Sequence, residues 1–179
     1  MEMTVSNFDE LIQQVKQKNV KDGGKKKVAV MCADDEEVLA ALVEARDSGV
    51  ADSFLVGNKE RILKVAQESK LDISNMEIID ESEIAKIGEI CTDLVNRGKA
   101  SVMMKGLVAT SDYMRAVLNK EKGLRSGKLL SHVAVFDLPT YHKFLAVTDA
   151  AVTVRPNIDE KAGLISNAAD VMRRLGVRK

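Results

Sequence analysis

Short apolar runs that alternate with amphipathic segments constrain the fold of this chain more than any other feature of its sequence. Four such runs occur, at residues 28–32, 53–56, 77–79 and 101–104, and each leads into a segment with apolar residues at helical spacing. Strands that read as continuous apolar runs are typical of a parallel sheet that is covered on both faces. Repeated strand–helix units with short connections place helices on both of those faces. The alternation therefore predicts an α/β fold, a three-layer αβα domain with a mainly parallel sheet.

The pattern changes after residue 128. Two strand-like runs, residues 129–136 and 143–154, are separated by a turn-like segment that contains Pro139. They predict an antiparallel pair, either at the sheet edge or as a bridge to another lobe. A last helix, about residues 158–175, has an apolar stripe formed by Ala162, Ile165, Ala169 and Met172. We expect residues 1–150 to form the αβα domain and residues 151–179 to begin a second domain, so that this stripe is partly uncovered and favours self-association.

Charge and composition argue against several classes of partner. The 27 Lys and Arg residues balance the 27 Asp and Glu residues, and no basic stripe is visible, which argues against nucleic-acid binding. The chain has no tryptophan and only 3% aromatic residues, so base-stacking platforms are not expected. No apolar run is long enough to span a bilayer, and the acidic N-terminal segment does not resemble a signal peptide. We expect a cytoplasmic protein without membrane partners.

The strand-like run at residues 101–104 leads into the most suggestive polar segment. Lys105 and Gly106 follow the run, residues 108–111 form a loop of small and hydroxyl side chains, and a helix is expected to open at Asp112. Backbone N–H groups at a helix start carry partial positive charge and bind anions. Lys105 adds a full charge there, and Gly106 allows the main chain to approach a ligand closely. This segment predicts a phosphate or oxyanion site.

The same spacing also suits an ordinary helix cap, with Thr110, Ser111 or Asp112 closing the helix. Other sequence signals of chemistry are missing. No GxGxxG, P-loop or GxSxG motif occurs, and the histidines and cysteines lack metal-ligand spacing, so no metal site is predicted. Cys32 and Cys91 are expected to be buried, reduced thiols.

Residues 105–139 carry a family resemblance. KGLVATS, followed by RAVLNKEKGLRSGKLLSHVAVFDLP, resembles the phosphate acetyl/butyryltransferase family, and its phosphate butyryltransferases most of all. KKKVAVMCADDEEVLAAL and FLAVTDAAVTVRPNIDEKAGLISNA extend the similarity to nearly the whole chain from Phe8 onward. The resemblance implies an isocitrate-dehydrogenase-like fold. Because members of the family resemble two-domain proteins of roughly double the typical single-domain length, we expect this chain to be their N-terminal portion, truncated before the rest of the second lobe.

The resemblance also implies an activity, the interconversion of acyl-CoA and phosphate with acyl phosphate and free coenzyme A. Coenzyme A is then a substrate, and no permanently bound cofactor is expected. The partly uncovered stripe of the last helix favours a homo-oligomer. The family's main catalytic segment, a serine–arginine pair followed by an aspartate base, has no counterpart before Lys179. The catalytic residues of this chain are therefore left unassigned, and the sequence leaves open whether the chain is active by itself.

Candidate binding residues follow from the resemblance. The positions that match the cleft-lining part of the family motif are Lys105, Gly106, Thr110, Ser111, Arg115 and Ser131. Asp149 is added because it follows an apolar run, and ligands of open α/β sheets bind beyond the carboxyl ends of strands. Asp149 also suits a turn or cap, and Arg115 suits the solvent-exposed surface. His132 is expected on the opposite strand face from Ser131, as a structural residue.

Two other functions stay open. The first is a different enzyme of the same architecture, which requires a nucleotide or metal motif that the sequence does not show. The second is a non-catalytic α/β ligand-binding or interaction domain.

Overall fold

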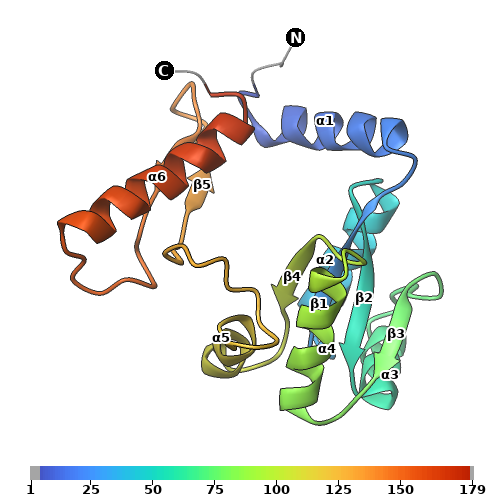
Figure 1. Cartoon of the computed structure of the whole chain (residues 1–179). Coiled ribbons are helices and arrows are strands. Elements are labelled where there is room, and N and C mark those ends of the chain that lie inside the picture. The colour runs from blue at the N-terminus through green and yellow to red at the C-terminus, as the bar shows by residue number, and fades with distance from the viewer. Residues whose placement is uncertain (1–4, 178–179) are drawn as a thin grey trace. The chain divides into compact units, whose positions relative to one another are not determined.

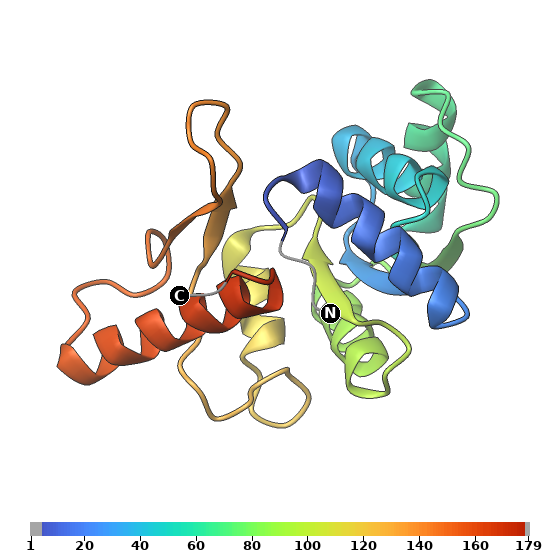
Figure 2. The same cartoon turned by 90° about the horizontal axis from the view of Figure 1, so that it is seen from above.

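The computed structural model describes residues 5–177, which form two compact units (Figures 1 and 2). One, here called the sheet unit, is Lys16–Ser126. The other, here called the hairpin unit, combines the described residues up to Val15 with those from Gly127 onward. This contact-based division changes over at residue 126, whereas the domain boundary expected at residue 150 stays a prediction. Within the described residues, no helix is both long enough and apolar enough to cross a membrane.

The sheet unit contains a four-stranded sheet in which all neighbouring strands are parallel, with the order β3-β2-β1-β4 (Figure 1). Its strands are β1 (Lys26–Met31), β2 (Ala51–Gly57), β3 (Glu77–Asp80) and β4 (Val102–Lys105). The helices that follow them are α2 (Glu36–Asp47), α3 (Lys59–Glu68), α4 (Ile84–Asn96) and α5 (Thr110–Val117). The chain enters the unit through α1 (Phe8–Lys21). The predicted parallel sheet is confirmed.

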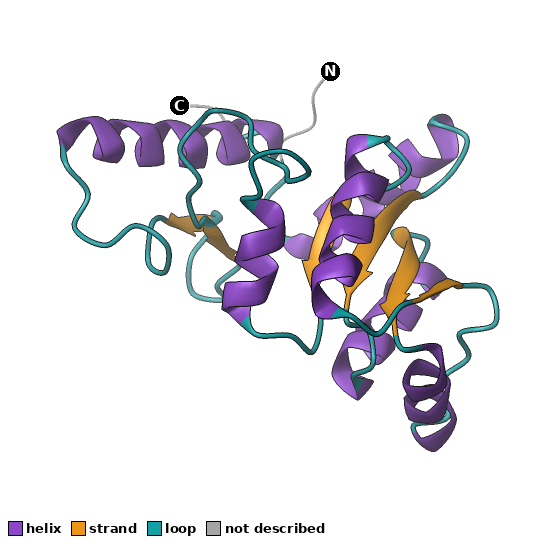
Figure 3. Cartoon of the chain, turned by 60° about the horizontal axis from the view of Figure 1, so that its bottom comes forward, coloured by secondary structure: helices purple, strands orange, loops and turns teal. Residues whose placement is uncertain are grey.

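Helices cover both faces of this sheet (Figure 3), and an aliphatic core lies on each face. Side chains alternate between the two faces of a strand. On one face Val30 of β1 and Leu55 of β2 pack in a cluster with residues of α2 and α3, including Leu39. On the other face Met31 and Val56 pack in a cluster with residues of α4. The three-layer αβα arrangement is therefore confirmed.

The hairpin unit contains β5 (Ala134–Phe136) and β6 (Leu145–Val147), which pair antiparallel in a separate two-stranded sheet, and α6 (Ile158–Arg174). The antiparallel pairing is confirmed, but the strands are shorter than predicted. The backbone of His132 shows why. Its N–H donates to the Asp149 carboxylate and its carbonyl accepts from the Thr148 hydroxyl, so side chains occupy groups that a longer ladder needs.

Helix α6 presents its apolar stripe outward. Ile165 is 67% exposed, and Ala162 and Ala169 are exposed with it. The inward face is a different one, on which Leu164 is buried and Gly163 lies against Leu129. The expectation that the stripe lacks cover is confirmed for these three residues.

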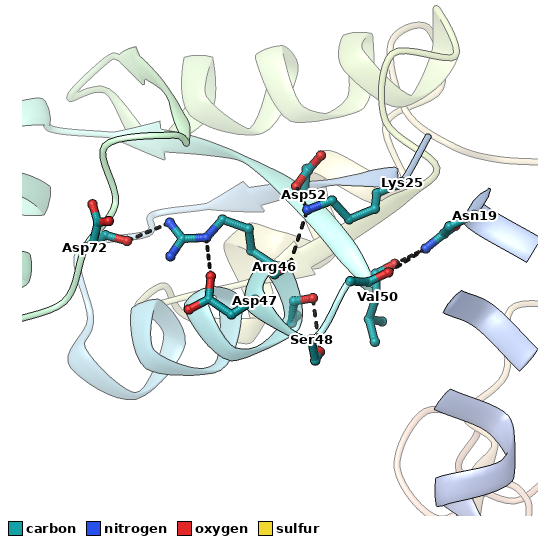
Figure 4. Close-up of polar contacts among 10 residues, drawn as sticks. Asn19, Lys25, Arg46, Asp47, Ser48, Val50, Asp52 and Asp72 are labelled. Carbon is teal, nitrogen blue, oxygen red and sulfur yellow. Dashed lines mark hydrogen bonds and ion pairs between the residues drawn. The ribbon is translucent and has the colours of Figure 1, made fainter. Parts of the chain in front are cut away.

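A buried asparagine joins α1 to the turn that precedes β2 (Figure 4). Asn19 is only 7% exposed. Its side-chain amide donates to the carbonyls of Gly49 and Val50 at 3.0 and 2.8 Å. One side chain therefore satisfies two consecutive main-chain acceptors at the end of the α2–β2 connection.

Charged side chains form hydrogen bonds and ion pairs at the same end of the sheet (Figure 4). Arg46, near the end of α2, donates to the Asp72 carbonyl and to the Asp47 carboxylate, each at 2.7 Å. Lys25 pairs with Asp52 at 2.7 Å and donates to the Arg46 carbonyl. These contacts lie near the strand starts, away from the carboxyl ends at which ligands bind in such sheets. We therefore interpret them as structural.

Candidate functional site

The candidate loop, residues 105–111, lies at a reversal in the strand order. After β1 the chain passes to β2 on one side, and β4 later pairs with the other side of β1. The loops that leave the carboxyl ends of β1 and β4 therefore diverge into helices from adjacent strands. Open α/β sheets bind their ligands at such a switch point. The topology places Lys105 and the following loop where a ligand is expected.

Gly106 is in tight contact with the loop that follows β1. Its N–H donates to the Met31 carbonyl and the N–H of Leu107 donates to the Cys32 carbonyl, both at 2.9 Å. A Cβ at Gly106 would lie 2.9 Å from the Met31 oxygen and from the Cys32 carbonyl carbon, and still closer to the Cys32 oxygen. The close approach that the structure shows is thus to the protein's own main chain, while the approach of Gly106 to a ligand stays a prediction.

Helix α5 begins at Thr110, two residues before the predicted start at Asp112. Ala109 occupies the N-cap position, and no side chain makes a capping hydrogen bond. The capping role that Thr110, Ser111 or Asp112 was alternatively expected to fill is therefore wrong. Thr110 and Ser111 are exposed, and their hydroxyls have no hydrogen-bond partner among residues 5–177. Two hydroxyls accordingly flank a helix start that no side chain caps.

The two predicted cations differ in their surroundings. Lys105 is exposed, and its ammonium makes a long 3.4 Å contact with the Gly106 carbonyl but no ion pair within the described part of the chain. Arg115 forms an ion pair with Asp112 one turn earlier on α5. Lys105 is thus the cation that can meet an anion without breaking an existing pair.

A tyrosine fixes α5 against the neighbouring strand. The Tyr113 hydroxyl donates to the Met103 carbonyl of β4 at 2.8 Å. Burial raises the pKa of this phenol, so it stays protonated and keeps donating at neutral pH. The strand before the candidate loop and the helix after it are therefore tied together directly.

Arg115 lines a pocket of about 520 Å³ that residues 105–111 do not line. It lies between α4 and α5, and a Lys122–Glu89 ion pair of 2.8 Å is part of its lining. Arg115 lines the pocket, whereas Lys105, Thr110 and Ser111 do not. The other lining residues are Ser82, Glu83, Ile84, Ala85, Thr92, Asp112, Ala116 and Asn119. Lys105 thus ends β4, Gly106 follows it, and Thr110 and Ser111 open α5, whereas Arg115 lines a pocket that none of these four residues line.

Ser131 and Asp149 belong to the hairpin unit, which is described separately from the loop. The Ser131 hydroxyl oxygen accepts a hydrogen bond from the Asn167 amide at 2.9 Å. The Asp149 carboxylate accepts from the N–H groups of Ala151, Val152 and His132, and from the Thr153 hydroxyl. These bonds make Asp149 the organising residue of a turn, as the alternative interpretation expected. Its contact with a ligand stays a prediction.

The hydrogen bonds to Asp149 predict an acid-sensitive hairpin unit. Chiefly the Ala151 N–H, with the other donors, holds the pKa of this carboxyl well below its ordinary value of 3.8. A lowered folded-state pKa stabilises the fold above the unfolded-state pKa, and this contribution is lost as the pH falls below about 4. We expect Asp149→Ala to lower the melting temperature at pH 7. The difference from wild type should narrow as the pH falls below 4, as followed by circular dichroism.

If the difference in melting temperature between Asp149→Ala and wild type stayed the same across that pH range, the hydrogen bonds to Asp149 would not be the origin of this stability. Asp159→Ala is a suitable control. Asp159 is an exposed residue in the same unit, and no side-chain hydrogen bond or ion pair is found for it within residues 5–177.

The surroundings of the two cysteines disfavour a nucleophilic role. Both are free and buried, and burial raises the pKa of each thiol, that of Cys91 to about 12. Thiols with raised pKa values carry little thiolate at neutral pH. Within the described residues, no group of three or more His, Cys, Asp or Glu side chains is arranged to hold a metal ion.

Asn167 is a polar contact residue that was not predicted from the sequence. Its amide donates to the Leu129 carbonyl as well as to Ser131, so it links α6 to the segment before β5. Asn167 lies three and four residues after Leu164 and Gly163, on the inward face of α6. The apolar spacing of the helix marks a different face, which is exposed, so the sequence alone holds no signal for Asn167.

Comparison with known proteins gives consistent matches. The family model described as phosphate acetyl/butaryl transferase matches residues 85–179. A phosphate butyryltransferase of Clostridium acetobutylicum is 40% identical over 173 residues, which is 97% of this chain and 56% of that protein. One from Clostridium beijerinckii is 44% identical over 171 residues, 96% of this chain and 55% of that protein. The chain thus spans about half the length of the curated relatives it matches.

Solved structures agree with the fold. A branched-chain phosphotransacylase from Enterococcus faecalis V583 superposes with a TM-score of 0.73 at 24% identity, over 85% of this chain and 52% of that one. EutD phosphotransacetylase from Staphylococcus aureus gives a TM-score of 0.75 at 19% identity, over 97% and 60% of the two chains. At these identities the similarity concerns the fold alone.

Proposed function

The chain belongs to the phosphate acetyl/butaryl transferase family, and we propose that it supplies the phosphate-binding part of a phosphate acyltransferase. The reaction interconverts acyl-CoA plus phosphate with acyl phosphate plus coenzyme A. One observation carries the proposal: the start of α5, which no side chain caps, follows Lys105 at the switch point of a parallel sheet. Such a helix start binds anions.

Each loop residue has a role in this proposal. The exposed hydroxyls of Thr110 and Ser111, with the N–H groups of the first turn of α5, donate to the phosphate oxygens. The ammonium of Lys105 provides a charge-assisted contact. Gly106 holds the loop against the β1 connection, so the donors stay in place before the ligand arrives. Arg115 joins them only after exchanging Asp112 for the ligand.

The chemical step needs stabilisation of developing charge. A phosphate oxygen attacks the thioester carbonyl carbon, the carbonyl oxygen becomes an oxyanion, and the coenzyme A thiolate leaves as the carbonyl reforms. Fixed donors such as the α5 N–H groups and Lys105 lower the energy of such charged states. In this proposal coenzyme A is a substrate, the protein holds no permanent cofactor, and it works in the cytoplasm. The exposed stripe of α6 supports assembly as a homo-oligomer.

Lys105→Ala tests the binding site. We expect inorganic phosphate to bind about tenfold to a hundredfold more weakly, with an unchanged melting temperature, because a hydrogen bond to a charged group contributes about 1.5–3 kcal/mol. Isothermal titration calorimetry at two salt concentrations measures the affinity. Lys120→Ala is the matched control, since Lys120 is an exposed lysine of the same unit for which no ion pair is found in the described residues.

An equal loss of phosphate affinity in Lys105→Ala and Lys120→Ala would indicate non-specific electrostatic attraction and would overturn the assignment of the site. Unchanged binding in Lys105→Ala would overturn it as well. Formation of acyl phosphate from acyl-CoA and phosphate is measured in parallel. Phosphate binding without turnover would support a ligand-binding module in place of a self-sufficient enzyme.

A further inference from the structure

The Asn167 side chain contacts the segment before β5 through both of its N–H groups. Its nitrogen Nδ2 lies 3.0 Å from the Leu129 carbonyl oxygen and 2.9 Å from the Ser131 hydroxyl oxygen. Gly163 and the buried Leu164 lie on the same face of α6, and the added Cβ of an alanine at Gly163 would meet Leu129 at 3.2 Å. Close helix packing therefore holds the Asn167 amide against this segment.

The Leu129 carbonyl sets the orientation of that amide. A backbone carbonyl can accept a hydrogen bond but cannot donate one, so the amide must turn its NH₂ group toward it. The oxygen and nitrogen of an asparagine are distinguished by such partners. With the NH₂ group fixed, its second N–H is the one that meets Ser131.

The consequence for Ser131 is a defined polarity. Its oxygen accepts from Asn167, so its own proton is directed to another partner. No residue within 5–177 accepts that proton. Ser131 is half-buried, which limits competition from bulk water. The hydroxyl is thus arranged as a hydrogen-bond donor.

We propose that Asn167 is a positioning residue that presents the Ser131 hydroxyl as a donor to an oxygen that can only accept, such as an ionised phosphate or acyl-phosphate oxygen. This inference rests on the proposed function. Asn167 acts through Ser131 and does not touch the ligand. It adds a polarity requirement, because a residue that accepts at position 167 reverses the direction of the hydroxyl.

A double-mutant cycle tests the inference. The variants are Asn167→Asp, Ser131→Ala and the double variant, each titrated with inorganic phosphate at pH 8. Aspartate has the shape of asparagine but accepts from Ser131 in place of donating. We expect each single variant to bind phosphate about fivefold more weakly, and the double variant to bind no more weakly than either.

A helix control separates positioning from stability. Asn157 closes the capping box of α6 and makes its side-chain contacts with Glu160, away from Ser131. Asn157→Ala should lower the melting temperature and leave phosphate affinity unchanged. Asn167→Ala provides a second variant at position 167, and it should weaken binding in wild type but not in the Ser131→Ala background.

The outcomes distinguish the inference from the proposed function. If the fold-losses of phosphate affinity multiply in the double variant, Asn167 acts independently of Ser131. That result overturns the inference and leaves the proposed function standing. The same holds if Ser131→Ala weakens binding while both Asn167 variants do not, or if Ser131→Ala binds normally while Lys105→Ala does not. Absence of phosphate binding by wild type overturns the inference together with the proposed function.

Discussion

Gly106→Ala is expected to destabilise the sheet unit by about 3 kcal/mol, the upper part of the range for forcing extra atoms into a packed site. The added Cβ would lie within 2.9 Å of two main-chain atoms of the β1 connection and closer still to the Cys32 carbonyl oxygen. Backbone atoms cannot rotate away as a side chain can, so a whole loop must shift. That shift stretches the hydrogen bonds from Gly106 and Leu107 to Met31 and Cys32.

Thermal and urea unfolding measure the effect, and about 3 kcal/mol corresponds to a melting temperature about 9 °C lower for a protein of this size. Gly24→Ala is the matched control. A Cβ at Gly24 meets nothing within 4 Å, because this glycine is exposed whereas Gly106 is buried. Neither glycine has a positive φ, so backbone conformation does not distinguish the two variants. A Gly106→Ala protein as stable as Gly24→Ala would contradict the tight contact between the two loops.

Asn19→Ala is expected to cost about 2 kcal/mol, because removing one partner of a buried hydrogen bond leaves the other partner unsatisfied. Here one amide serves the Gly49 and Val50 carbonyls, and Asn19 is only 7% exposed (Figure 4). The loss should appear as a lower urea midpoint with an unchanged slope, since the contact does not alter the surface exposed on unfolding.

Asn96→Ala provides the comparison for Asn19→Ala. The Asn96 amide also donates to two consecutive carbonyls, those of Lys122 and Gly123, but at 3.3 Å each and on an exposed residue. We expect a cost of about 0.5 kcal/mol there. Equal losses in the two variants would show that burial does not determine the strength of these contacts.

The layers of the sheet unit could be predicted from the sequence because burial on two faces leaves a local mark. The apolar runs of β1 and β2 and the helical spacing of α2 and α4 are visible without any tertiary information. The ends of the strands in the hairpin unit cannot be predicted in this way. Residues 129–133 are apolar enough for a strand, but Thr148 and Asp149 bond to the His132 backbone, and only the folded chain brings them there.

Helix α6 shows the limit of periodicity. The stripe of Ala162, Ile165 and Ala169 has helical spacing, yet it is exposed, and the inward face is chosen by Gly163 and Leu164. Spacing reveals that a face is apolar but not what covers it. The same reasoning explains why Asn167 was missed.

The candidate loop was located correctly at the end of a strand, but its local geometry was not. Hydroxyl residues near a helix start usually cap it, whereas here Ala109 takes that position and α5 begins earlier. Capping depends on the backbone angles of one residue, which the composition of the loop does not determine. The grouping of Ser131 and Asp149 with Lys105 in one site stays a prediction.

The placement of the tyrosines gives each unit its own optical reporter. The chain has two tyrosines and no tryptophan, with Tyr113 in the sheet unit and Tyr141 in the hairpin unit. Tyr113 is hydrogen-bonded between the strand and the helix that flank the candidate loop, while Tyr141 is 46% exposed beside the His142 ring. Intrinsic fluorescence therefore carries one signal from each unit, and replacing either tyrosine with phenylalanine leaves the other as the single emitter.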